Sequence, residues 1–192
     1  MKVISLRSPG GLDNLEVLDT EAPGEPGPGE MRVRIHASSL NFHDYLVANG
    51  SIRTEDGRIP MSDGAGVVEA VGDGVEEFAV GDRVVSTFFP DWLDGRARVG
   101  NFRRTPGDGI DGYAREQVVA KSQCFTRAPE GYSHQEAATL DTTPATIRET
   151  TRLLKMTSRV EPRGHLCSSA ENSAETNLIQ ISMWETLVSM SK

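Results

Sequence analysis

Residues 62–72 read SDGAGVVEAVG, and the prediction of the fold starts from this stretch. Gly64, Gly66 and Gly72 flank β-branched residues, a pattern that favours a buried strand. The next residues, GDGVEEFAVGD (72–82), combine acids and glycines and predict a surface turn that reverses the chain. Gly81 and Asp82 then lead into a second strand over 83–88. These residues determine the fold, and catalysis must be sought elsewhere in the sequence.

Short strand-like runs extend on both sides of this stretch. They are KVISL (2–6), LEVLD (15–19), MRVRIHAS (31–38), RVVSTFF (83–89) and YAREQVVA (113–120), separated by glycine-rich turns such as PGEPGPGE (23–30). Two helical segments interrupt them: FHDYLVAN (42–49), ended by Gly50, and SHQEAATL (133–140), which has Ser133 and Glu136 at capping-box spacing. The pattern predicts a mainly β fold with short helices, arranged as a partly open barrel.

Composition changes near residue 140. Of 19 glycines, 18 lie in residues 1–140, and residues 141–192 hold six basic and six acidic side chains. The net charge of -8 therefore belongs to the first part. We expect one domain over 1–140 and an atypical tail over 141–192. In that tail, Thr143 and Pro144 predict the start of a helix over 145–156, and residues 177–192 either form an amphipathic helix or stay unpaired.

The overall composition limits the classes of function. An acidic chain with 20 basic and 28 acidic residues does not indicate a nucleic-acid-binding protein. The first residues lack the apolar core of a signal peptide, and no apolar run is long enough to span a membrane. Two cysteines, Cys124 and Cys167, are too few for a disulfide framework. We expect a cytoplasmic protein.

Five segments in a fixed order resemble a known family. SSLNFHD, SDGAGVVEAVG, FAVGDRVV, DGYAREQVV and APEGYSHQEAATL resemble the GroES-like catalytic domain of the medium-chain dehydrogenase/reductase superfamily, over residues 1–140. The likeness is to its zinc-free quinone oxidoreductase and alcohol-dehydrogenase-like branch. The resemblance implies an NADPH-dependent oxidoreductase that acts on a quinone, an enone or a related carbonyl.

The positions of the zinc ligands differ from those of the zinc-dependent relatives. Asn41 stands where they have Cys, and Ser62 and Asp63 stand where they have His and Glu. Amide and hydroxyl groups are poor zinc ligands, so we expect no metal. In the zinc-free branch, Asn41 and Asp44 would border the nicotinamide pocket. The same two residues also fit a helix N-terminus, Asn41 as its cap and Asp44 in its first turn.

Three further groups are candidate site residues. His43 could donate a proton to a developing enolate, although a surface histidine on a helix is the alternative. By resemblance, a tyrosine proton donor would stand at position 46, where this chain has Leu46, and Tyr45 lies one place earlier as a candidate substrate contact. Phe88, Phe89 and Trp92 lie in a segment that resembles a substrate-lining loop, or else serve as packing residues.

A glycine-rich motif resembles a nucleotide fingerprint only in spacing. GDGIDG (107–112) matches G-x-G-x-x-G, but a polar loop precedes it and a strand follows, so no helix N-terminus would meet a pyrophosphate. The superfamily's Rossmann domain would begin after SHQEAATL, where this sequence shows one glycine in 52 residues and no βαβ pattern.

Two functions remain open from the sequence. The first is an oxidoreductase-family chain that is truncated and inactive alone. The second is a non-catalytic GroES-like fragment that serves, if anything, as an interaction module. By resemblance, the partner of the first would be a small-molecule carbonyl or quinone substrate, and the second could bind another copy or a full-length paralogue that supplies a Rossmann domain. The sequence leaves the substrate, the choice of NADPH over NADH and the oligomeric state undetermined.

Overall fold

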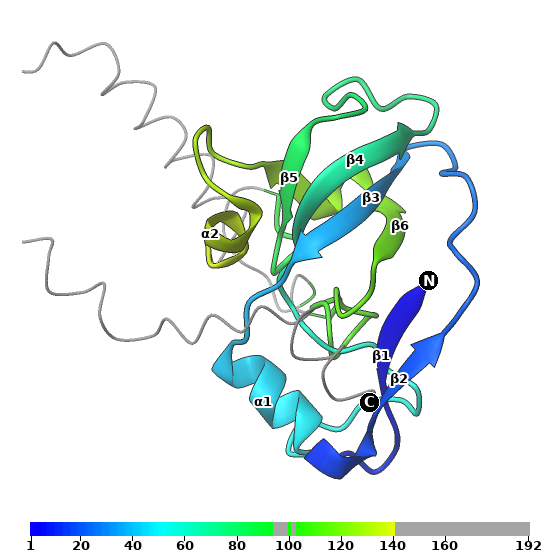
Figure 1. Cartoon of the computed structure of the whole chain (residues 1–192), viewed down its shortest axis with the longest axis vertical. Coiled ribbons are helices and arrows are strands. Elements are labelled where there is room, and N and C mark those ends of the chain that lie inside the picture. Colours follow the sequence, from blue (N-terminus) through cyan, green and yellow to red (C-terminus); the bar gives the residue numbers. More distant parts are fainter. Residues whose placement is uncertain (94–99, 101–102, 141–192) are drawn as a thin grey trace, which may run out of the picture.

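The structure is a computed structural model that describes residues 1–93, 100 and 103–140 (Figure 1). Its strands and helices, in chain order, are β1 (Lys2–Leu6), β2 (Leu15–Asp19), β3 (Glu30–Ala37), α1 (Phe42–Ala48), β4 (Ala65–Val71), β5 (Arg83–Ser86), β6 (Gln117–Lys121), β7 (Phe125–Arg127) and α2 (His134–Ala138). Short 3-10 turns, η1 (Leu12–Asn14) and η3 (Ser122–Cys124), precede β2 and β7.

The described strands form two antiparallel sheets. β1 and β2 make a two-stranded sheet, and the larger sheet has the order β6-β3-β4-β5-β7. Neither sheet closes on itself, which confirms the predicted mainly β, partly open fold. In the part of the chain that the structure describes there is no Rossmann domain. As Figure 1 shows, α1 lies at the β1–β2 end of the molecule and α2 lies against the larger sheet.

The main hydrophobic core is formed largely by side chains of the larger sheet. Strand β3 alternates between buried and more exposed residues, as expected when one face of a strand is covered. Its inward side chains pack with buried residues from the neighbouring strands, including Val68, Val84, Val118 and Phe125. A second cluster joins Ala65 and Val85 of the sheet to Ala137 and Ala138 of α2. Small side chains at this contact let the short helix approach the sheet closely.

Two glycines at the start of β4 are required by close packing. A Cβ atom added at Gly66 would overlap the Arg34 carbonyl oxygen of the paired strand β3, and one added at Gly64 would come within 2.7 Å of the Tyr113 ring. Neither residue has a positive φ, so the cause is space and not backbone conformation. This explains two of the three glycines of the stretch 62–72, Gly64 and Gly66.

Several predicted boundaries differ from those observed. The run 83–89 is strand only to Ser86, so Phe88 and Phe89 lie in the loop that follows β5. The run 113–120 becomes a strand only at Gln117, and β7 was not predicted. Helix α1 ends as predicted, with Asn49 at the C-cap and Gly50 at φ 82°. The Ser133–Glu136 capping box is present at α2, where Glu136 N donates to Ser133 Oγ over 3.1 Å.

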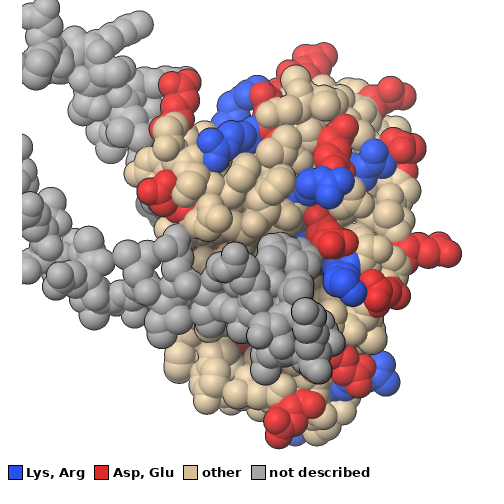
Figure 2. Space-filling view, viewed as in Figure 1, with Lys and Arg blue, Asp and Glu red and all other residues tan. Residues whose placement is uncertain are grey.

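Charged side chains of both signs mix on the visible surface. Figure 2 shows Lys and Arg beside Asp and Glu over the larger sheet, where Glu69 pairs with both Arg32 and Arg34. Within the described residues, no helix combines the length and the apolar character needed to cross a bilayer. The helices predicted for 145–156 and 177–192 lie outside the described residues.

Candidate active site

Asp44 anchors the first turn of α1. It is 1% exposed, and its two carboxylate oxygens accept hydrogen bonds from the backbone N–H groups of Asn41 and Ser62, each over 2.8 Å. One bond satisfies a donor at the helix start, and the other ties the helix to the segment before β4. Asp44 therefore fixes where the N-terminus of α1 lies relative to the larger sheet.

Asn41 is the N-cap residue of α1 and forms a capping box with Asp44, while the nitrogen of its side-chain amide is directed towards the segment before β4. Its Nδ2 donates to Asp63 Oδ2 over 2.7 Å and to Ser62 Oγ over 3.3 Å. Ser39 Oγ donates to the same Asp63 oxygen over 2.7 Å. Asp63 is 2% exposed and Ser62 is fully buried. These polar groups, 21 and 22 positions from Asn41 in the sequence, form one buried network beneath the helix start.

His43 lies between two carboxylates. Its Nε2 is 3.2 Å from Asp108 Oδ2, while its Nδ1 is buried, 3.8 Å from Asp44 Oδ1 and without a hydrogen-bond partner. The hydrogen bond to Asp108 is the main cause that raises the pKa of His43 to about 9, the nearby Asp44 adds to it, and burial opposes it. At neutral pH the ring is an imidazolium, and its Nε2–H donates to Asp108.

Aromatic rings continue the site from His43. The His43 and Phe88 rings form a T-shaped pair with centroids 5.3 Å apart, Phe88 meets Phe89 at 4.6 Å, and Phe89 lies 6.4 Å from Trp92. All three aromatic residues are half-buried in the loop after β5. The structure thus places the predicted aromatic residues beside the predicted polar ones, and this series of rings is called the aromatic wall.

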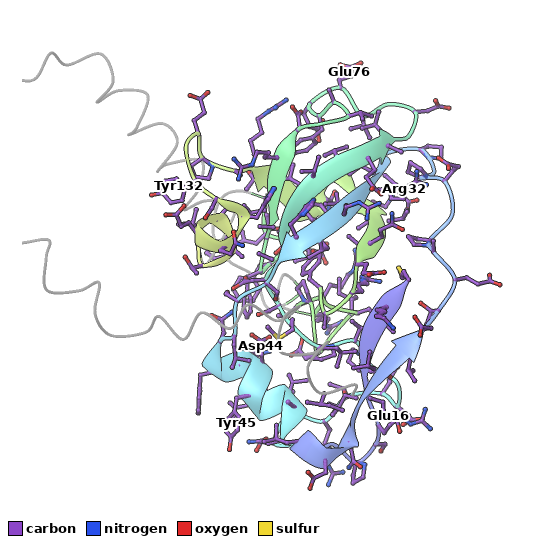
Figure 3. All side chains as sticks on the ribbon, in the orientation of Figure 1. Glu16, Arg32, Asp44, Tyr45, Glu76 and Tyr132 are labelled. Atoms are coloured by element: carbon purple, nitrogen blue, oxygen red, sulfur yellow. The ribbon has the colours of Figure 1, made fainter. Side chains whose placement is uncertain are left out.

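Tyr45 lies apart from this group. Figure 3 shows Asp44 turned towards the body of the molecule and Tyr45 on the outer side of α1. Tyr45 is 46% exposed and contacts Phe42, which is 72% exposed, with ring centroids 6.2 Å apart. Successive helical residues point in different directions, so Tyr45 cannot share the face of Asp44. The described geometry does not join it to the aromatic wall.

The glycine-rich segment 107–112 is a loop, and no helix follows it. Gly107 has φ 91°, and a Cβ added at Gly112 would overlap the Met61 carbonyl oxygen. Asp108 also accepts a hydrogen bond from the N–H of Gly109 through Oδ1, while Oδ2 faces His43. The segment therefore does not have the strand–turn–helix form of a dinucleotide motif, and it presents a carboxylate to α1.

Two residues of the network are not apparent from the sequence alone. Asp108 reaches His43 across 65 positions, and Ser39 shares Asp63 with Asn41. The one signal for Asp108 is an acid within a glycine-rich loop, and for Ser39 it is a hydroxyl two residues before the helix cap. Only the folded chain brings them together.

A family model described as "Alcohol dehydrogenase GroES-like domain" matches residues 27–130. The mainly β fold with two open sheets agrees with a GroES-like domain. The chain belongs to this alcohol dehydrogenase family, within the medium-chain dehydrogenase/reductase superfamily, as the resemblance predicted.

Relatives support this assignment. The "Zinc-type alcohol dehydrogenase-like protein C1773.06c" of Schizosaccharomyces pombe is 36% identical over 132 residues, covering 68% of this chain and 38% of the relative. A solved NAD-dependent alcohol dehydrogenase is 36% identical, with a TM-score of 0.61, over 73% of this chain and 43% of that one. The quinone oxidoreductase of Pseudomonas syringae is 31% identical, with a TM-score of 0.56, over 84% of this chain and 42% of that one. This chain spans about two fifths of each.

Proposed function

We propose that this chain forms the substrate side of a nicotinamide-dependent reductase of quinones, enones or related carbonyls, with NADPH as the cofactor. The family assignment and the likeness to a solved quinone oxidoreductase support an oxidoreductase. The observation that carries the proposal is the position of His43, a cation at neutral pH that contacts the aromatic wall. A flat conjugated substrate suits such a wall, and a cation suits the negative charge that its reduction creates.

The described residues fit one end of the cofactor. NADPH would supply the hydride, and Asn41 and Asp44 would border its nicotinamide at the start of α1. The buried Nδ1 of His43, which lacks a hydrogen-bond partner, is the polar atom that remains to act there. If His43 gives a proton to an enolate, that proton leaves from Nδ1, because Nε2 is bonded to Asp108.

We further propose that the site works without zinc. Asn41, Ser62 and Asp63 occupy the expected ligand positions, and they are hydrogen-bonded to one another. An amide and a hydroxyl do not fit zinc, which prefers thiolate, imidazole and carboxylate. Among the described residues no group of three or more His, Cys, Asp or Glu side chains could hold a metal ion. The name of the zinc-type relative describes that protein.

The test is the binding of menadione, a quinone, to the purified protein in the presence of NADPH, measured by calorimetry. We expect saturable binding whose affinity falls roughly 10-fold in Asn41→Ala, because the helix start loses the amide that positions it. Glu16→Gln, on the exposed strand β2, is the matched control and should retain the wild-type affinity. Equal affinities in wild type and Asn41→Ala would contradict the assignment of Asn41 to the site.

A second candidate is a non-catalytic interaction module. It is favoured by the exposed aromatic pair Phe42 and Tyr45 on α1. Aromatic side chains on a surface are typical of protein contacts. The substitution pair Phe42→Ser and Tyr45→Ser separates the candidates, since it should abolish self-association or partner binding under this reading and leave menadione binding unchanged under the first.

A further inference from the structure

Asp63 is the buried centre of the network beneath Asn41. It is 2% exposed and lies just before β4. Its Oδ2 accepts from Ser39 Oγ and Asn41 Nδ2, each over 2.7 Å, and its backbone carbonyl accepts from Ser38 Oγ, also over 2.7 Å. Three donors from the segment before α1 therefore converge on one residue of a distant segment.

This arrangement determines which way the Asn41 amide faces. A primary amide can rotate by half a turn and exchange its oxygen and nitrogen, because the two ends have the same shape. A carboxylate only accepts hydrogen bonds, so the end that faces Asp63 must be the nitrogen. Ser62 Oγ, 3.3 Å from the same Nδ2, offers a second acceptor on that side. The carbonyl oxygen then points away from Asp63, on the side of the Asp44 backbone N–H with which it forms the capping box, and its second lone pair remains for a ligand.

We propose that Asp63 is a positioning residue that holds Asn41 with its nitrogen inward, so that Asn41 offers a ligand only its carbonyl oxygen and selects a ligand group that donates a hydrogen bond. Such groups are a primary carboxamide or a hydroxyl. The selection of a ligand rests on the proposed function, whereas the orientation of the amide does not.

This orientation gives Asn41 and His43 different roles in the site. The Asn41 amide nitrogen has two N–H groups, and they face Asp63 Oδ2 and Ser62 Oγ, so neither is directed at a negative oxygen of a substrate and Asn41 does not stabilise an enolate. His43, held by Asp108 and two residues further along the chain, supplies the positive charge. Asn41 orients a donor group, and His43 responds to developing charge.

The test of the orientation uses nuclear magnetic resonance of the side-chain amides in the ¹⁵N-labelled chain, with the Asn41 signals assigned through Asn41→Asp. A bond to a buried carboxylate should slow the exchange of the Nδ2 protons with solvent. In Asp63→Asn, whose new amide both donates and accepts, exchange should accelerate roughly tenfold or more and both proton signals should move.

Two controls accompany this measurement. Gln117 Nε2 donates to Glu69 Oε2 over 2.6 Å, so it is an amide–carboxylate pair outside the site, and its signals should not change in Asp63→Asn. Ser39→Ala removes one donor and leaves the Asp63–Asn41 bond, so Asn41 should keep its slow exchange. If Asp63→Asn does not fold, the wild type alone decides: exchange at Asn41 as fast as in an unstructured peptide overturns the proposal, and slow exchange supports it.

The selection of a donor is tested with nicotinamide and nicotinic acid. Nicotinamide carries a carboxamide that donates, whereas nicotinic acid carries a carboxylate that only accepts. Larger shifts of the Asn41 signals with nicotinamide than with the acid would support the proposal. Equal shifts, or larger ones with the acid, would overturn it. If neither compound shifts the Asn41 signals, the proposed function is contradicted at the nicotinamide end of the site. The orientation of the Asn41 amide is then still tested by the exchange measurement.

Discussion

Asp108 gives His43 a raised pKa, which the position of His43 on a short helix would not predict. The hydrogen bond to Asp108 and the proximity of Asp44 raise the pKa of His43 to about 9, although burial alone would lower it. Asp44 and the order of residues around His43 are apparent from the sequence, but Asp108 is not. Charges that meet only in the fold determine this pKa, so sequence could propose His43 and could not predict its charge at neutral pH.

This pKa predicts a pH dependence of stability. The folded pKa lies above the unfolded value of 6.5, so the ion pairs stabilise the fold fully below about pH 6.5, and this contribution is lost as pH rises through 9. We expect the free energy of unfolding to fall by about 1–3 kcal/mol between pH 6.5 and 9.5. Urea unfolding at several pH values measures it.

Two substitutions isolate this effect. His43→Gln should remove the decrease, and Asp108→Asn should shift it to lower pH, because the pKa of His43 then moves back towards its ordinary value. A decrease of the same size in His43→Gln would assign the effect to other groups.

At the scale of secondary structure, α1 depends on one side chain. The sequence predicts the helix, its N-cap and Gly50 at its end, because these signals are local. It does not show that Asp44 also binds the Ser62 backbone, which is 18 positions away. The boundaries of β5 and β6 were less accurate, since strand ends depend on pairing with other strands.

Loss of the Asp44 side chain should destabilise the domain. Asp44→Ala leaves the backbone N–H groups of Asn41 and Ser62 without their acceptor in a buried place, so we expect a loss of roughly 2–4 kcal/mol. Phe42→Ala, in the same turn but 72% exposed, should change stability by less than about 0.5 kcal/mol. Thermal or urea unfolding compares them. Similar losses in both variants would show that the cap is not the cause.

The contact between α2 and the larger sheet should weaken in acid. His134 stacks on His36 of β3 with centroids 4.7 Å apart. Burial, Arg83 and His36 lower the pKa of His134 to about 4. The folded pKa is below the unfolded one, so stability is lost as pH falls from about 6.5 towards 4. The protection factors of the α2 amides, in which the intrinsic pH dependence of hydrogen exchange is divided out, should fall over this range, and less so in His134→Gln. Protection factors that do not change with pH in the wild type would refute the link.

For the whole molecule, the family and the mainly β fold could be predicted from the sequence, because five local segments stand in the family's order. Of the predicted site residues, Asn41, Asp44, His43 and the aromatic wall lie close together, whereas Tyr45 points away, and their roles remain predictions. The division at residue 140 and the zinc-free chemistry remain predictions. The chain spans about two fifths of its relatives, so the activity of a whole enzyme remains a proposal.

The central claim is that the start of α1 and the aromatic wall form the substrate side of the site. Titration of the ¹⁵N-labelled chain with menadione, in the presence of NADPH and followed by nuclear magnetic resonance, tests it most directly. We expect saturable shifts of the signals of Asn41, His43, Phe88 and the Trp92 indole, and no shift at Glu16 on β2. Shifts that fall elsewhere, or no saturable shift at these residues, would contradict it.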